Sequence, residues 1–215
     1  MSLILAEVKT PKKDYGRVED GTYFGRVVSV VDMGTQPQTD WQTKEPTDPK
    51  PRVMITWELG SERIEVEQED GSLVSKPRWI GKEYTISTFE QANLMKLLTA
   101  VAPQATALDE LLNVPCMVQV GSTSTGNAKI VSVMPAPKGM EVPELENDTL
   151  HFDFSHPDKE LYDALPAWMQ KKITEAIDYT GFADEGYVDE SEATPAKAPA
   201  KSAKSSDDFD DDIPF

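Results

Sequence analysis

Tryptophans lie among lysines and arginines in two stretches of the chain, residues 33–51 and 76–82. Such combinations are typical of sites for unpaired nucleic acid, because bases stack on aromatic rings and phosphates pair with cations. The candidate residues in and beside these stretches are Trp41, Lys44, Lys50, Arg52, Arg78, Trp79 and Lys82. Supporting candidates, chosen by residue type and position, are Tyr23, Arg26, Arg63 and Lys129.

The four tryptophans have different expected roles. Trp41 lies in a long polar segment, which favours contact with nucleic acid over packing on the C-terminal part of the chain. Trp79 falls on the strand face opposite its apolar neighbours, and both a buried and an exposed place stay open for it. Trp57 shares a strand face with apolar residues and is expected in the core. Trp168 begins an expected helix and is predicted to pack.

The last nine residues combine acidic and aromatic side chains. Five aspartates surround one phenylalanine, and the sequence then ends in Ile-Pro-Phe. This tip has too little apolar surface to fold alone, but it can bind a partner that offers an apolar pocket with a basic rim. The partner-binding candidates are Asp207, Asp208, Phe209, Asp210, Asp211, Asp212, Ile213, Pro214 and Phe215.

The tip closely resembles the acidic end of bacterial and phage single-stranded DNA-binding proteins, in which Asp-Phe-Asp-Asp-Asp-Ile-Pro-Phe closes the chain. The resemblance implies a phage-type protein that coats and protects single-stranded DNA in DNA replication, recombination and repair. It also implies that the tip recruits partner enzymes such as a polymerase, primase, helicase or nuclease. The resemblance covers only the tip, so the candidate DNA-binding residues are proposed from residue type and position alone.

Negative charge is unevenly distributed along the chain. The formal net charge is −17, yet residues 1–138 carry 15 Lys and Arg against 18 Asp and Glu. Residues 139–182 and residues 183–215 each carry 3 basic against 10 acidic residues. The N-terminal body is therefore near neutral and can carry a basic face. The tethered tip is expected to compete with DNA for that face.

The elements expected in residues 1–138 are three or four strands, a helix and two more strands. Aromatic, β-branched or alternating segments predict strands at residues 22–31, 52–59, 63–67, 78–87, 116–120 and 128–134. Helical spacing covers residues 89–101, with Thr88 as the N-cap, and residues 33–51 are expected to form a long loop. This order predicts a mainly β chain with a five-stranded OB-fold barrel, β-β-β-α-β-β. Another α+β fold stays open.

Three segments follow the expected DNA-binding domain, residues 1–138. Residues 139–182 predict a C-terminal extension with a helix over 166–179, which lies on the barrel or pairs with a second subunit. The usual bacterial single-stranded DNA-binding protein lacks such an extension, so the resemblance does not imply its tetrameric assembly for this chain. The oligomeric state stays open, with a homo-oligomer as one alternative. Residues 183–206 have the composition of a disordered linker, and residues 207–215 form the acidic tip.

The sequence argues against several other classes. It contains no phosphate-binding loop and no serine-hydrolase motif, so no enzyme activity is expected. One cysteine and two histidines make a metal site or a cofactor unexpected, and Cys116 is predicted to be buried in a strand. No apolar run approaches the ~20 residues of a membrane span, so a cytoplasmic protein without a membrane partner is expected, in the bacterial host if phage-encoded.

Two alternative functions remain open. The chain can be a replication or recombination adaptor whose barrel binds protein rather than DNA, and the near-neutral body favours this. It can also be an acidic mimic of DNA, in which case the whole body repels nucleic acid.

Overall fold

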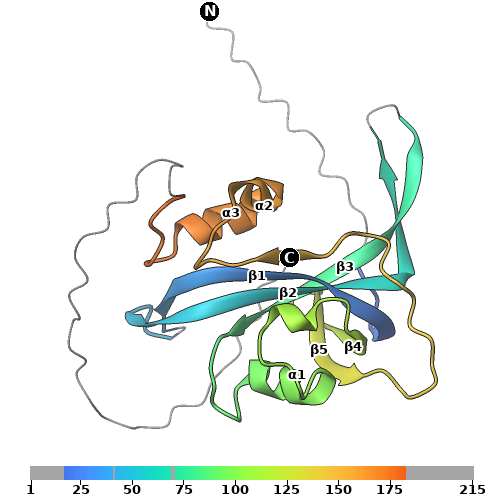
Figure 1. Cartoon of the computed structure of the whole chain (residues 1–215), viewed down its shortest axis with the longest axis horizontal. Helices are drawn as coiled ribbons and strands as arrows, with labels where there is room; N and C mark the ends of the chain where they lie inside the picture. Colours follow the sequence, from blue (N-terminus) through green and yellow to red (C-terminus); the bar gives the residue numbers. More distant parts are fainter. Residues whose placement is uncertain (1–16, 41, 69–70, 183–215) are drawn as a thin grey trace, which may run out of the picture.

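A six-stranded, largely antiparallel open sheet forms the centre of the molecule (Figure 1). The computed structural model describes residues 17–40, 42–68 and 71–182. The neighbouring strands of the sheet follow the order β3-β2-β1-β4-β5, and a short sixth strand, β6, pairs in parallel with β1. The prediction of a mainly β chain is confirmed. The strands are β1 (Gly21–Thr39), β2 (Pro46–Glu67), β3 (Leu73–Thr85), β4 (Pro115–Ser122), β5 (Ala128–Pro135) and β6 (Leu150–Phe152).

Helices lie on both faces of the sheet (Figure 1). Helix α1 (Asn93–Val101) covers one face and is followed by a 3-10 turn, η1 (Asp109–Leu111). Helices α2 (Lys159–Ala164) and α3 (Ala167–Thr174) cover the other face. The chain order of β1, β2 and β3, then α1, then β4 and β5 agrees with the order expected from the sequence.

Both predicted helix boundaries need correction. Helix α1 begins at Asn93 rather than beside Thr88, because the preceding residues form a turn in which Ala92 N donates to Phe89 O at 2.9 Å. The helix expected over 166–179 ends at Thr174. Strand β6 and helix α2 were not predicted, since they span only 3 and 6 residues and are too short to show a period.

The larger apolar core lies between the sheet and α1. It buries the alternate residues of β2, including Trp57, which is 0% exposed as its strand face predicted. Cys116 is also 0% exposed, and burial raises the pKa of its thiol to about 12. Its role is therefore that of a small apolar side chain. The other large contributors are Val53, Ile55, Leu59, Ile80, Leu94, Leu97, Leu111 and Val118.

A second core joins the opposite sheet face to the C-terminal extension. Phe152, Leu165, Met169 and Ile173 pack there on residues of β1 and β2. The close approach depends on Gly34, which has a φ of +68° and lies at a register shift in β1. A Cβ at this position would lie 2.6 Å from the Phe154 ring, so any larger residue would push the extension away.

The long loop expected over residues 33–51 is mostly strand. β1 continues to Thr39 and β2 begins at Pro46, which leaves a short turn. The backbone N–H groups of Thr43 and Gln42 donate hydrogen bonds to the carboxylate of Asp40 and stabilise this turn. The same hydrogen bonds hold the pKa of Asp40 below its usual value. The prediction failed because the segment is polar and rich in proline. The ladder accommodates Pro37 and Pro49 at one register shift, whereas Pro46 and Pro51 lie opposite Thr39 and Thr35.

The second hairpin extends away from the sheet as an arm (Figure 1). β1 pairs with β2 only as far as Glu58, and beyond that residue β2 pairs with β3 alone. We call residues 60–67 and 73–77 the β2–β3 arm. Its exposed apolar residues include Leu73, which is 63% exposed, and Gly71, between its two strands, has the positive φ of a turn residue. The charged strand expected over 63–67 is therefore the outer part of β2.

Candidate nucleic-acid interface

Two half-exposed tryptophans line one groove on the sheet face that carries the extension. Trp79 on β3 is 51% exposed, and Trp168 in the first turn of α3 is 42% exposed. The groove has a volume of about 590 Å³. We call it the tryptophan groove. Its lining residues are Arg17, Val18, Ser29, Met54, Thr56, Arg78, Trp79, Ile80, Gly81, Gly126, Asn127, Ala128, Asp148, Leu150, Ala164, Leu165, Pro166, Trp168 and Met169.

The sheet supplies one side of the groove through the outer faces of β2 and β3. Thr56 pairs with Gly81, and two positions further along Glu58 pairs with Trp79, so these four residues share one face. Ile80 lies between them in sequence and packs into the larger core. This alternation places the Trp79 ring outside the core, which resolves the choice that the sequence left open.

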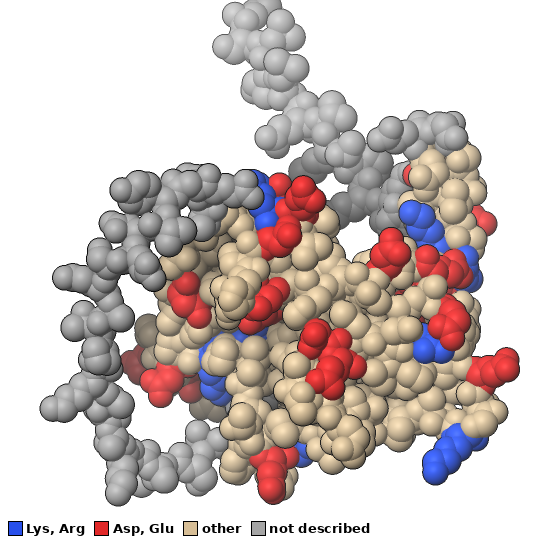
Figure 2. All heavy atoms as spheres, in the orientation of Figure 1, with Lys and Arg blue, Asp and Glu red and all other residues tan. Residues whose placement is uncertain are grey.

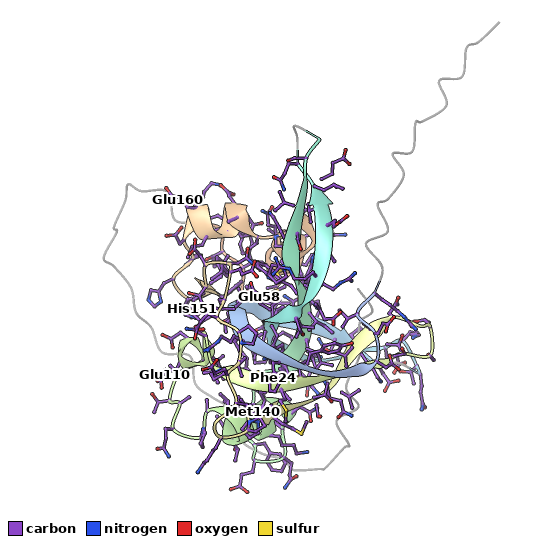
Figure 3. The ribbon with its side chains drawn as sticks, turned by 90° about the vertical axis from the view of Figure 1, so that its right-hand side faces the viewer. Phe24, Glu58, Glu110, Met140, His151 and Glu160 are labelled. Carbon is purple, nitrogen blue, oxygen red and sulfur yellow. The ribbon has the colours of Figure 1, made fainter. Side chains whose placement is uncertain are left out.

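A buried carboxylate fixes the Trp79 indole. Glu58 is 2% exposed and accepts a hydrogen bond from Trp79 Nε1 at 3.1 Å. It also accepts from Glu146 N at 2.7 Å and from Asn147 Nδ2 at 2.6 Å. Figure 3 labels Glu58 at the root of the β2–β3 arm. One side chain therefore ties Trp79 to the segment that leads into β6.

Another part of the lining comes from the connection between β4 and β5, which is closed by a turn. Arg17 Nη1 donates to Gly126 O and to Ser122 Oγ, the latter at 3.2 Å. Ser122 Oγ in turn donates to Asp20 at 2.6 Å. The Arg17 guanidinium is therefore held on this turn while it lines the groove. Arg17 and Arg78 against Asp148 give the lining a net positive charge.

Three of the arginines predicted to bind DNA are engaged within the protein. Arg26 donates to the backbone oxygens of Pro143 at 2.9 Å and Val142 at 3.2 Å, and it pairs with Glu144 at 2.7 Å. Arg63 donates to Ser75 O at 2.9 Å and pairs with Glu146.

Arg52 donates to Gln38 Oε1 at 2.6 Å and lies 3.6 Å from the carboxylate of Glu83, which also pairs with Lys172 of α3. Each of these three arginines is paired with a carboxylate, which a phosphate would have to displace. We therefore assign Arg26, Arg52 and Arg63 to holding the strands and the extension together.

The other residues predicted to bind DNA lie partly at the edge of the larger core and partly on the surface. Tyr23 packs against the larger core and donates to Glu19 O at 2.9 Å. Lys82 lies 5.6 Å from the centre of the Tyr84 ring. Lys50 and Lys129 are half-buried on β2 and β5, and Lys44 is exposed in the β1–β2 turn with a φ of +60°. Of the predicted residues that the structure describes, only Arg78 and Trp79 line the tryptophan groove.

The remaining predictions fall on parts of the chain that are not described. Trp41, the linker over 183–206 and the tip over 207–215 all lie outside the described residues. Their proposed roles stay predictions.

Sequence reasoning missed Trp168 and Arg17 as groove residues. Trp168 was expected to pack, because its neighbour Met169 belongs to the apolar stripe of α3. A helix presents adjacent residues about 100° apart, so Trp168 points away from that stripe. Arg17 precedes the first strand and carries no local signal at all. Its place depends on a contact with Gly126, which is far away in the sequence.

Charge on the visible surface is mixed. On the face drawn in Figure 2, acidic and basic side chains are interspersed and most of the surface carries neither. This agrees with the near-neutral charge of residues 1–138. The Lys and Arg residues on this face do not form a continuous stripe, so any nucleic-acid binding there depends on local contacts more than on a basic surface.

No family model, curated protein or solved structure matches the chain. Among the described residues, no group of three or more His, Cys, Asp and Glu side chains is placed to hold a metal ion. None of the helices in these residues is both long and apolar enough to cross a membrane.

Proposed function

We propose that this chain is a single-stranded DNA-binding protein and that it binds DNA in the tryptophan groove. The observation that carries the proposal is that one groove brings together two half-exposed indoles, Trp79 and Trp168, and two cations, Arg17 and Arg78. Stacking of a base on an aromatic ring contributes about 1–3 kcal/mol and is tolerant of sequence. The arginines supply charge for the adjacent phosphates.

The position of the groove supports an OB-fold assignment. OB-folds bind oligonucleotides on the face of their second and third strands, beside the connections between strands 1 and 2 and between strands 4 and 5. Here β2 and β3 contribute Thr56, Trp79 and Gly81, and the β4–β5 turn contributes Gly126 and Asn127. The sheet order β3-β2-β1-β4-β5, with α1 between β3 and β4 in the chain, fits a barrel left open between its third and fifth strands.

The acidic tip supports the biological role. Its likeness to the tips of bacterial and phage single-stranded DNA-binding proteins favours a protein that protects DNA in replication, recombination and repair. In this proposal the barrel holds the strand, while residues 207–215 recruit a polymerase, primase, helicase or nuclease. The bacterial cytoplasm is the location that fits this role.

Titration of oligo-dT with tryptophan fluorescence as the readout tests the proposal. Trp79→Ala should weaken binding roughly five- to a hundredfold, which is the loss of one stacked base. Phe89→Ala is the matched control, because Phe89 is 68% exposed but does not line the groove. Absence of oligo-dT binding by the full chain at low salt would contradict the proposal.

One observation favours a second candidate function. Arg26, Arg52 and Arg63 are occupied by internal partners, which leaves the sheet with fewer cations for DNA than its sequence suggests. A replication or recombination adaptor that binds protein through the same groove would need no such cations. Tight oligo-dT binding that weakens with salt would exclude the adaptor.

A further inference from the structure

The C-terminal extension is firmly fixed on the sheet. Ile173 of α3 is 1% exposed in the second core. Polar contacts hold the same helix at its end, where Gln36 Nε2 donates to Lys172 O at 3.0 Å and Lys172 pairs with Glu83. Beyond α3, Asp178 accepts from Thr35 N at 2.9 Å and from Thr35 Oγ1 at 2.6 Å. The extension therefore has a single place on the β1–β2 face.

This placement makes the extension one wall of the tryptophan groove. The wall consists of Ala164, Leu165, Pro166, Trp168 and Met169, opposite the strands that carry Trp79. Leu165 and Met169 are 5% and 7% exposed, so they anchor the wall in the second core, whereas Trp168 between them is 42% exposed. A segment that is anchored on both sides of an exposed indole holds that indole in a defined position.

We infer that the extension is part of the DNA site, and that Trp168 stacks on an unpaired base as Trp79 does from the opposite side. The inference rests on the proposed function and deepens it, because it adds a second stacking residue and a wall that would keep duplex DNA out of the groove. An unpaired base can turn its flat face toward an indole inside a walled groove. A paired base is already stacked within its duplex and brings a second strand that the wall excludes.

The test compares oligo-dT with a blunt duplex of the same length in the full chain. Trp168→Ala should weaken oligo-dT binding roughly five- to a hundredfold, and Trp168→Phe should restore most of the affinity because the aromatic face returns. Leu161→Ala is the matched control, since Leu161 is 37% exposed on α2 and outside the groove. Any weak duplex binding should be equal in wild type and in Trp168→Ala. Thermal unfolding of each variant checks that its fold is as stable as that of the wild type.

The outcomes separate this inference from the proposed function. Failure of the wild type to bind oligo-dT overturns both. If Trp79→Ala weakens binding but Trp168→Ala changes it less than twofold, the extension is not part of the site and the proposed function stands. An equal loss for oligo-dT and duplex in Trp168→Ala would also overturn the inference, because it would indicate a contact that does not need an unpaired base.

Discussion

At the scale of single residues, the carboxylate of Glu58 contributes both to the stability of the fold and to the candidate site. Its buried carboxylate accepts three hydrogen bonds, one of which comes from the indole of Trp79. Buried polar groups of this kind are costly to leave unpaired. The side chain that orients Trp79 is therefore also one that holds residues 146 and 147 on the sheet.

We expect Glu58→Gln to lower the free energy of unfolding by about 1–3 kcal/mol, because the amide NH₂ turns a donor toward groups that are themselves donors. Urea denaturation measures the change. Glu65→Gln is the matched control, since Glu65 is an exposed glutamate of the same strand, and its effect should stay within about 0.5 kcal/mol. Equal effects of the two substitutions would show that the three hydrogen bonds do not stabilise the fold.

In contrast to Glu58→Gln, a substitution at Lys44 is expected to stabilise the fold. Its φ of +60° is a left-handed conformation, which costs a residue with a side chain about 1–2 kcal/mol. Lys44→Gly should therefore raise the free energy of unfolding by roughly 0.5–1 kcal/mol after the entropy of the new glycine is subtracted. Thermal and urea unfolding provide the measurement. Gln42→Gly is the control, because Gln42 lies in the same turn and has no positive φ. It should not raise the free energy of unfolding.

At the scale of elements, the junction between α3 and the sheet is the contact on which the groove depends. Ile173 and Ile177 provide a matched pair, because the same residue type is 1% exposed at one position and 62% exposed at the other. Ile173→Ala should cost about 2–5 kcal/mol in urea denaturation, as expected for a buried large-to-small change. Ile177→Ala should change stability by no more than about 0.5 kcal/mol. Similar losses at both positions would argue against the docking of α3 described above.

The elements also show how far sequence reasoning could go. Strong alternation and β-branched residues located the central strands, and the leucine spacing located α1. The outer part of the β1–β2 hairpin was missed because backbone pairing there continues through polar residues and prolines, which carry no apolar period. Of the two arginines and two tryptophans that line the groove, one of each was predicted from the sequence. Arg78 and Trp79 are adjacent in sequence, whereas Arg17 and Trp168 join them only through long-range packing.

At the scale of the whole molecule, the groove contains few cations and the chain carries a net charge of −17. If only Arg17 and Arg78 meet phosphates, the plot of log affinity against log salt for oligo-dT should have a slope of about −1.4. Fluorescence titration at several salt concentrations measures it. A much steeper slope would show that the DNA also meets lysines outside the groove, such as Lys44 and Lys50.

The acidic tip predicts a second effect of charge. Deletion of residues 207–215 should raise oligo-dT affinity at low salt, because five tethered aspartates no longer compete with the strand. The gain should fade as salt screens the tail. Phe215→Ala keeps those aspartates, so it should leave DNA affinity unchanged while weakening partner binding. Unchanged or weaker DNA binding by the deletion variant would argue against competition.

The β2–β3 arm is a place at which the chain can accept inserted residues. Within the arm the two strands pair only with each other and contribute no residue to either core, so added residues there disturb neither core. Insertions of two residues in each strand would keep Ile64, Val66 and Val74 on the face that they occupy now, because strands alternate with a period of two. The arm can thus acquire a new recognition sequence while the groove keeps its shape.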